Sequence, residues 1–246
     1  MKIAVLGGSG TAGAAVVGAG RKRGHEMSSC SRRNGVDVLS GEGLGEALTG
    51  ADAVIDVSSV LTLSGRRSLD FFRRTTATIL DTAERCGTPH VVRLSIIGVD
   101  RNPHGFYSGQ LAMEEMYEAS SVPSTILRAA QFHEFAAQTV ERASLGPLVL
   151  VPRARIRPVA VQEVGERLVT LAEGPPQGRS SDLAGPREED LVELVRAYAG
   201  HIGRRSMVLP MRLPVAMMRG MRRGLNLPGA DVELRGGDFA EWLTEQ

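Results

Sequence analysis

The first thirteen residues constrain the fold more than any other part of the chain. The apolar run Met1–Leu6 is followed at once by the small residues 7–13, and these by Ala14–Val17. This order is typical of a strand, a tight turn and a helix, because glycine lets the backbone turn sharply and approach a ligand closely. The helix N-terminus offers free N–H groups to a pyrophosphate. The pattern predicts dinucleotide binding; the alternative is a turn that only packs a helix on a sheet.

The glycines of this turn fit two spacings, Gly8-x-Gly10-x-x-Gly13 and Gly7-x-x-Gly10-x-x-Gly13. Both are compatible with a backbone that wraps around phosphate groups. The residues expected to hold the pyrophosphate are Gly7, Ser9, Gly10, Thr11, Ala12 and Gly13.

Strand and helix patterns then alternate along the chain. The expected strands are Met1–Leu6, His25–Ser31, Ala53–Val57, His90–Ser95 and Ser124–Arg128. The expected helices are Ala12–Arg23, Gly41–Leu48, Ser68–Cys86 and Leu111–Ser120. Continuous apolar strands in this rhythm predict a parallel sheet covered on both faces, which is a doubly wound, Rossmann-type α/β fold. Ligands bind such a sheet outside the carboxyl ends of its strands.

The rhythm loosens after about residue 145. We therefore expect a dinucleotide-binding region at 1–145 and a smaller C-terminal substrate or lid region at 146–246, packed as one globular unit. Helical patterns recur at Val159–Glu173, after a strand edge, and at Glu188–Ala199. Four methionines gather beyond them, either as adaptable core or as the lining of an apolar pocket. They are Met211, Met217, Met218 and Met221.

Composition excludes several classes of function. A net charge of +1, scattered arginines and 4% aromatic residues argue against nucleic-acid binding. No apolar run is long enough to span a membrane, and no signal peptide precedes the first strand, so we expect a cytoplasmic protein.

Cys30 and Cys86 are expected to be reduced, buried residues, and no metal-ligand spacing occurs. The excess of arginine over lysine, with abundant alanine and glycine, suggests a bacterial gene.

The end of the second expected strand indicates which dinucleotide binds. The residues there are Cys30-Ser-Arg-Arg33, and no acidic side chain is present to hold a ribose 2′-hydroxyl. Arg32 and Arg33 suit a 2′-phosphate instead, which favours NADPH over NADH; the alternative is that both are solvated surface charges. Asp37 either receives the adenine amino group or simply begins the next turn.

Several segments together resemble the atypical short-chain dehydrogenases/reductases of the NmrA-like, NAD(P)H-binding type. The segments are Gly7–Gly13, Arg32, Ala51–Ser59, Val91–Val99, Thr125–His133, Leu183–Pro186 and Gly237–Trp242. The resemblance covers essentially the whole chain. It implies that Val57 and Ser58 pass beside a ribose of the cofactor. It also implies that Ser95 occupies the position of the family's active-site serine, and that Ala130, Gln131 and Phe132 lie near the nicotinamide.

One departure from the family pattern bears directly on the chemistry. Catalytic members carry Tyr-x-x-x-Lys on one helical face, where the tyrosine donates a proton and the lysine lowers its pKa. The matching positions here hold Phe106 and Gln110, and a shift by one pairs Tyr107 with Leu111. Phenylalanine has no proton to donate, and glutamine supplies no charge. Ordinary alcohol–ketone chemistry is therefore not expected.

Three routes around the missing dyad remain open. Tyr107 could act as the acid, His104 or His133 could donate a proton, or the substrate could need little acid catalysis. The last is favoured, since a quinone or conjugated carbonyl accepts hydride to give a delocalised anion that water protonates.

We therefore expect an NADPH-dependent oxidoreductase acting on a small molecule, with Ser95, Tyr107 and Gln110 around the reacting oxygen and a possible homodimer. The alternative is a non-catalytic dinucleotide sensor that binds a protein partner. A sugar-nucleotide epimerase is less favoured, because that chemistry generally needs the missing dyad.

Overall fold

The computed structural model describes all residues from 1 to 246 and divides them into two compact units. Unit 1 comprises residues 1–95, 105–128 and 162–181, and unit 2 comprises residues 96–104, 129–161 and 182–246. The chain thus passes repeatedly from one unit to the other. The predicted boundary near residue 145 stays a prediction.

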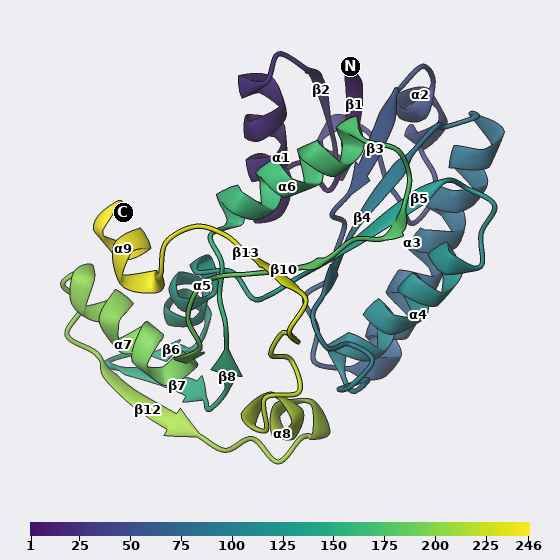
Figure 1. Cartoon of the computed structure of the whole chain (residues 1–246). Coiled ribbons are helices and arrows are strands. Elements are labelled where there is room, and N and C mark those ends of the chain that lie inside the picture. The colour runs from purple at the N-terminus through teal and green to yellow at the C-terminus, as the bar shows by residue number, and fades with distance from the viewer. The chain divides into compact units, whose positions relative to one another are not determined.

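Unit 1 is built on a parallel sheet in the order β5-β4-β3-β1-β2 (Figure 1). The strands are β1 Lys2–Leu6, β2 Glu26–Cys30, β3 Ala53–Asp56, β4 Val91–Ile96 and β5 Ser124–Ala129. The short strand β9, Gly178–Arg179, pairs with β5. Because β1 lies between β2 and β3, the direction of the strand order reverses between β1 and β3. Sheets of this kind bind ligands beyond the carboxyl ends of their strands at this point.

Helices cover this sheet on both faces. They are α1 Thr11–Lys22, α2 Leu44–Leu48, α3 Gly65–Arg85, α4 Phe106–Glu118 and α6 Val161–Glu173. In Figure 1, α1 and α6 lie on one side and α3 and α4 on the other. Close approach is possible because small residues meet: a Cβ on Gly165 would lie 2.7 Å from the backbone of Ala15. The predicted Rossmann-type α/β fold is confirmed.

Unit 2 contains smaller pieces of sheet. The strands β6 Ser144–Leu145, β7 Leu148–Pro152 and β12 Met207–Met211 form a three-stranded sheet in the order β12-β7-β6. Strand β8 Arg155–Ile156 pairs with β11 Glu189–Asp190, and β10 Asp182–Ala184 pairs with β13 Val232–Leu234. The helices are α5 Glu134–Arg142, α7 Leu191–His201, α8 Ala216–Arg222 and α9 Phe239–Thr244.

Most expected elements of unit 1 appear within a few residues of their predicted bounds. The segment expected on a helix, Leu111–Ser120, lies largely in α4, which begins earlier, at Phe106. Gly105 precedes it with φ +58°, a conformation that favours glycine, and Gly109 lies inside the helix. A Cβ on Gly109 would lie within 2.3 Å of Ser68, so glycine is needed there for α3 and α4 to pack closely.

Three further expectations concern the cysteines, the methionines and membrane-spanning helices. Both cysteines are free; Cys30 is buried as expected, whereas Cys86 is only half-buried because it follows the last residue of α3. Met217, Met218 and Met221 are buried, and Met211 is half-buried. None of the helices combines the length and apolarity that crossing a membrane would require.

Candidate functional site

The glycine turn after β1 forms a compact, backbone-lined cradle. Gly7 has φ +83°, its N–H donates to the carbonyl of Cys30, and the N–H of Gly10 donates to the carbonyl of Gly7. Gly10 caps α1 without a side-chain hydrogen bond, and the first turn of this helix carries no acidic residue. The first N–H groups of α1 are thereby left for an anion, as a pyrophosphate requires.

Two glycines of the turn have no room for a side chain. A Cβ on Gly13 would lie 2.2 Å from the carbonyl oxygen of Gly7, and a Cβ on Gly8 would lie 2.4 Å from Oγ of Ser29. The nearest atom to a Cβ on Gly10 would be 3.4 Å away. Gly8 and Gly13 therefore set the shape of the turn, whereas a Cβ on Gly10 would make only an ordinary contact.

The end of β2 is joined to this cradle through the carbonyl of Cys30, which also accepts from the N–H of Gly8. Burial raises the pKa of the Cys30 thiol, so it behaves as a core residue. Arg32 and Arg33 follow in a short 3-10 turn and are exposed. No acidic side chain lies between Ser28 and Val36, which leaves these two guanidinium groups as the charges at this end of the strand.

Asp37 begins a turn, which is one of the two roles that its position in the sequence allows. Its carboxylate accepts from the N–H of Leu39 at 2.8 Å, and its carbonyl accepts from the N–H of Gly41. The aspartate therefore stabilises the turn that leads to α2. A contact with adenine stays a prediction.

A buried ion pair holds the segment after β3. Arg93 on β4 lies 2.8 Å from the carboxylate of Asp56, and the two side chains are 1% and 2% exposed. The same guanidinium donates to the carbonyl oxygens of Asp56 and Ser58, and the Asp56 carboxylate accepts from the N–H of Ser58. The backbone of Val57 and Ser58 is thus fixed from both sides.

Tyr117 of α4 completes this arrangement by donating to Asp56 at 3.2 Å. Burial raises the pKa of Tyr117 well above its ordinary value, and the Asp56 carboxylate acts in the same direction, so the phenol keeps its proton. The ring of Phe72 packs 5.6 Å from the Arg93 guanidinium. The pair is therefore neutralised and largely hydrogen-bonded, as a buried charge requires.

The fixed segment brings one unsatisfied polar atom next to the glycine turn. A Cβ on Gly7 would lie 3.1 Å from the backbone of Ser58, so the two segments are in contact. The Ser58 hydroxyl is buried and has no hydrogen-bond partner. An unpaired buried hydroxyl is costly, and a ligand hydroxyl or phosphate in the cradle would satisfy it.

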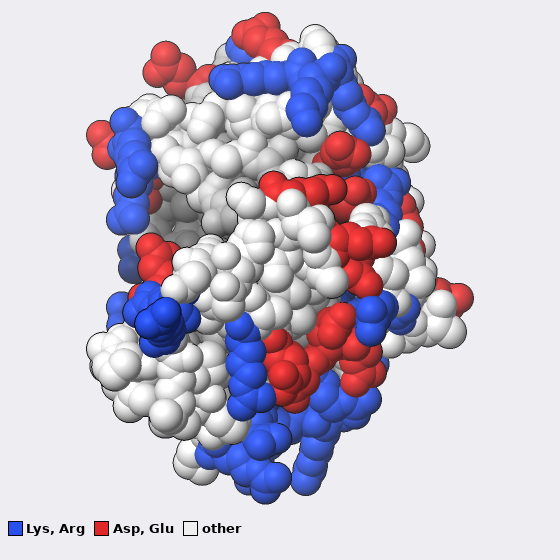
Figure 2. Space-filling model, turned by 90° about the vertical axis from the view of Figure 1, so that its left-hand side faces the viewer, with Lys and Arg blue, Asp and Glu red and all other residues white.

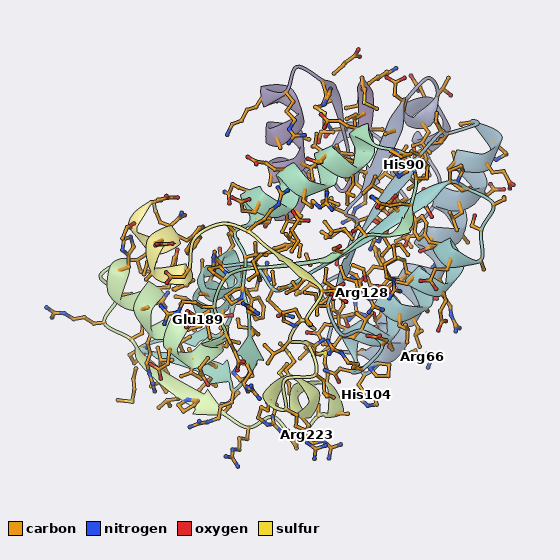
Figure 3. The ribbon with its side chains drawn as sticks, viewed as in Figure 1. Arg66, His90, His104, Arg128, Glu189 and Arg223 are labelled. Atoms are coloured by element: carbon orange, nitrogen blue, oxygen red, sulfur yellow. The ribbon has the colours of Figure 1, made fainter.

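Ser95 takes part in a second buried network that the sequence did not reveal. Its hydroxyl donates to Glu114 of α4, and Glu114 also accepts from Arg128 of β5 at 2.7 Å and from Arg179 at 3.0 Å. Figure 3 labels the position of Arg128. Arg179 reaches Glu118 as well, at 2.8 Å. The serine proton is therefore already engaged, which weakens Ser95 as a donor to a substrate oxygen.

The two positions of the missing dyad lie in the first turns of α4. Phe106 packs on Phe72 and on Tyr107, with ring centroids 5.7 Å and 6.0 Å apart. Gln110, one turn later, is buried, and its Oε1 has no hydrogen-bond partner. A half-buried aromatic ring thus takes the position of the family's acid, and a neutral amide takes the position of its cation.

The remaining candidates belong to unit 2. Gln131 and Phe132 lie in the segment after β5, where Val159 donates to the carbonyl of Gln131 and pairs with Phe132. His133 packs in a cluster with Phe239 and Trp242, whose rings also contact each other, and burial lowers the pKa of His133. His104 is exposed. The packing of His133 against aromatic rings therefore favours a structural role for this residue.

No family model and no curated protein matches the chain, whereas solved structures do. An NADPH-dependent quinone oxidoreductase from Escherichia coli, complexed with NADPH, is 15% identical, with TM-score 0.74 and coverage of 99% of each chain. A short-chain dehydrogenase/reductase superfamily protein from Agrobacterium tumefaciens with bound NAD is 16% identical, with TM-score 0.69 and coverage of 100% of this chain and 95% of that one.

A nucleoside-diphosphate-sugar epimerase from Staphylococcus aureus is also similar. It is 16% identical, with TM-score 0.68, and the alignment covers 100% of this chain and 96% of that chain. A quinone oxidoreductase and a sugar-nucleotide epimerase catalyse different reactions, so the likeness carries no single reaction. At this identity it establishes the fold, which is the Rossmann-type α/β fold expected from the family resemblance.

Proposed function

We propose that the protein is an NADPH-dependent reductase that transfers hydride to a quinone-like or conjugated carbonyl compound. The observation that carries the proposal is the altered acid position: it holds Phe106, and the hydroxyl of Ser95 already donates to Glu114, in a chain whose glycine turn suits a dinucleotide. NADPH, when bound, supplies the hydride. A proton from water completes the reduction of the acceptor.

The residues of unit 1 fit this cofactor. The glycine turn and the first N–H groups of α1 suit a pyrophosphate, and Arg32 with Arg33 suits a 2′-phosphate. The unpaired hydroxyl of Ser58 suits a ribose or phosphate oxygen. The similar Escherichia coli protein, whose structure contains NADPH, supports the same choice.

The acid side of the site favours an acceptor that needs little protonation during hydride transfer. Gln110 is neutral: its unpaired Oε1 can accept from a ligand hydroxyl and its amide N–H can donate, but it supplies neither a transferable proton nor a positive charge. A simple ketone would become an alkoxide, which demands a donor. A quinone spreads the same charge over its ring and both oxygens, so orientation and exclusion of water suffice.

The test is NADPH oxidation by the purified protein with a panel of quinones, conjugated ketones and simple ketones, with NADH in parallel. We expect steady turnover of a quinone with NADPH and little turnover of simple ketones. The double variant Phe106→Tyr/Gln110→Lys should gain simple-ketone reduction, because it restores the donor and the cation on one helical face. A folded double variant with no gain would count against the assigned positions.

The same missing dyad also suits a dinucleotide sensor without catalytic activity, which would act through a protein partner. Tight NADPH binding with no turnover across the quinone panel would favour the sensor and refute the reductase proposal.

A further inference from the structure

The three-stranded sheet of unit 2 carries apolar side chains on both of its faces. Val149 and Val151 of β7 and Val208 of β12 are buried on one face, and α5 and α7 are the helices that pack on the sheet. The alternate positions of the same strands are also apolar and only half-buried, as in Leu148 and Leu150. Sheets with one face in water normally place polar side chains on that face. The second face here departs from that pattern.

Strand register brings the apolar residues of this second face together. Leu148 pairs with Leu145 on one side and with Met207 on the other, so the three form a row across the sheet. Leu145 and Met207 are 64% and 62% exposed. Leu150 pairs with Leu209 in the next row of the same face. We call this surface the outer sheet face; its residues are Leu145, Leu148, Leu150, Met207, Leu209 and Met211.

Exposed arginines lie at both ends of the outer sheet face. Arg204 and Arg205 precede β12, and Arg212 directly follows it. Arg153, just beyond β7, donates its N–H to the carbonyl of Met211, which places it at the same end as Arg212. No Asp or Glu occurs in residues 142–162 or 194–230, the segments that build this surface. Figure 2 shows blue side chains gathered at the lower end of the view beside uncoloured surface.

The charge pattern selects among possible occupants of this face. A second copy of the chain, packed face to face about a two-fold axis, would bring these arginines against their own equivalents. A single-stranded nucleic acid would require stacking platforms, but residues 143–161 and 202–230 contain no Phe, Tyr or Trp. Apolar side chains between exposed arginines instead match the boundary of a bilayer that carries negative headgroups.

We propose that the outer sheet face docks the protein on the surface of a membrane that contains anionic phospholipid. Leu145 and Met207 enter the boundary between headgroups and acyl chains, while Arg205 and Arg212 contact lipid phosphates. This docking does not depend on the proposed function. If both hold, the docked protein meets apolar quinones in the phase where they dissolve.

The experiment is co-sedimentation of the full chain with vesicles of phosphatidylglycerol and phosphatidylcholine, compared with phosphatidylcholine alone. We expect binding to the anionic vesicles that is at least ten-fold tighter and that weakens with added salt. Arg205→Gln/Arg212→Gln should reduce this binding about 25-fold, since each arginine near such a surface contributes roughly five-fold. Leu145→Glu/Met207→Glu should abolish vesicle binding, because both substituted side chains then carry a negative charge into the apolar layer.

The matched control is Leu61→Glu/Leu63→Glu, which changes two side chains that are 78% and 68% exposed in unit 1. This variant should bind the vesicles like the unaltered protein, and circular dichroism should show all variants folded. Equal affinity for neutral and anionic vesicles, no binding to either, or equal loss in the control would overturn the proposal. A dimer in solution that Met207→Glu dissociates would also overturn it, by assigning the face to a second copy.

Discussion

The buried pair of Arg93 and Asp56 allows a sharp test of how the site is held. In the variant Arg93→Met, the Asp56 carboxylate loses its cation but keeps the hydrogen bonds from Tyr117 and from the N–H of Ser58. The carbonyl of Ser58 loses the donor that the guanidinium supplied. The change therefore strands a buried charge and releases the segment that carries the Ser58 hydroxyl.

The expected loss of stability follows from burial. Removing one partner of a buried ion pair costs about 3–5 kcal/mol, because the remaining charge stays out of water. The same substitution in an exposed pair provides the control: Arg74 and Asp70 are 63% and 66% exposed and lie one helical turn apart on α3. Arg74→Met should cost no more than about 0.5 kcal/mol.

The assay is urea unfolding followed by far-ultraviolet circular dichroism, with NADPH titration of each folded variant. Arg93→Met should lower both the free energy of unfolding and the affinity for NADPH, whereas Arg74→Met should leave both nearly unchanged. Adding Asp56→Asn to Arg93→Met should recover part of the stability, since it removes the stranded charge. Equal unfolding free energies for the two single variants would refute the reasoning.

Three other predictions concern separate parts of the molecule. Arg32→Ala should weaken NADPH binding at least ten-fold and NADH binding less than three-fold in fluorescence titrations; equal weakening would remove the 2′-phosphate assignment. Gly13→Ala forces a Cβ against the Gly7 carbonyl and should abolish nucleotide binding, while Gly18→Ala, with open space around it, should bind normally and gain about 0.5–1 kcal/mol of stability. Burial lowers the pKa of His90 and of His133 below 6.5, so the unfolded chain binds more protons and the free energy of unfolding should fall from pH 7 to pH 5. His133→Phe should reduce that slope, and a slope equal to that of the unaltered protein would contradict the assignment.

The sequence was sufficient for the main strands and most helices of unit 1, because β1, β3, β4 and β5 are short, largely apolar runs. The sequence placed Leu111–Ser120 on a helix but did not define where that helix begins, because the roles of Gly105 and Gly109 depend on distant contacts. In the structure Gly105 caps the helix and Gly109 provides close packing against Ser68. Whether a glycine ends a helix or packs one depends on a partner that is distant in the sequence.

The site was predictable where local pattern determines it and hidden where distant residues meet. The cradle is encoded in seven consecutive residues, so its position followed from spacing alone. The pairs Arg93–Asp56 and Arg128–Glu114 join residues on different strands and helices, which no local pattern connects. A signal was present, since Asp56, Arg93 and Arg128 each interrupt an apolar strand, and a charge in such a place requires a buried partner.

The central claim is that hydride reaches the acceptor without a proton donated by the protein. The most direct measurement is a single turnover with NADPH deuterated at the transferred position, mixed with a quinone, in water and in heavy water. Hydride transfer without a protein acid should give a primary isotope effect at the deuterated position and no solvent isotope effect on the same step. A solvent isotope effect of comparable size, or one that disappears in Tyr107→Phe, would show that a protein acid takes part and that the proposed reaction is wrong.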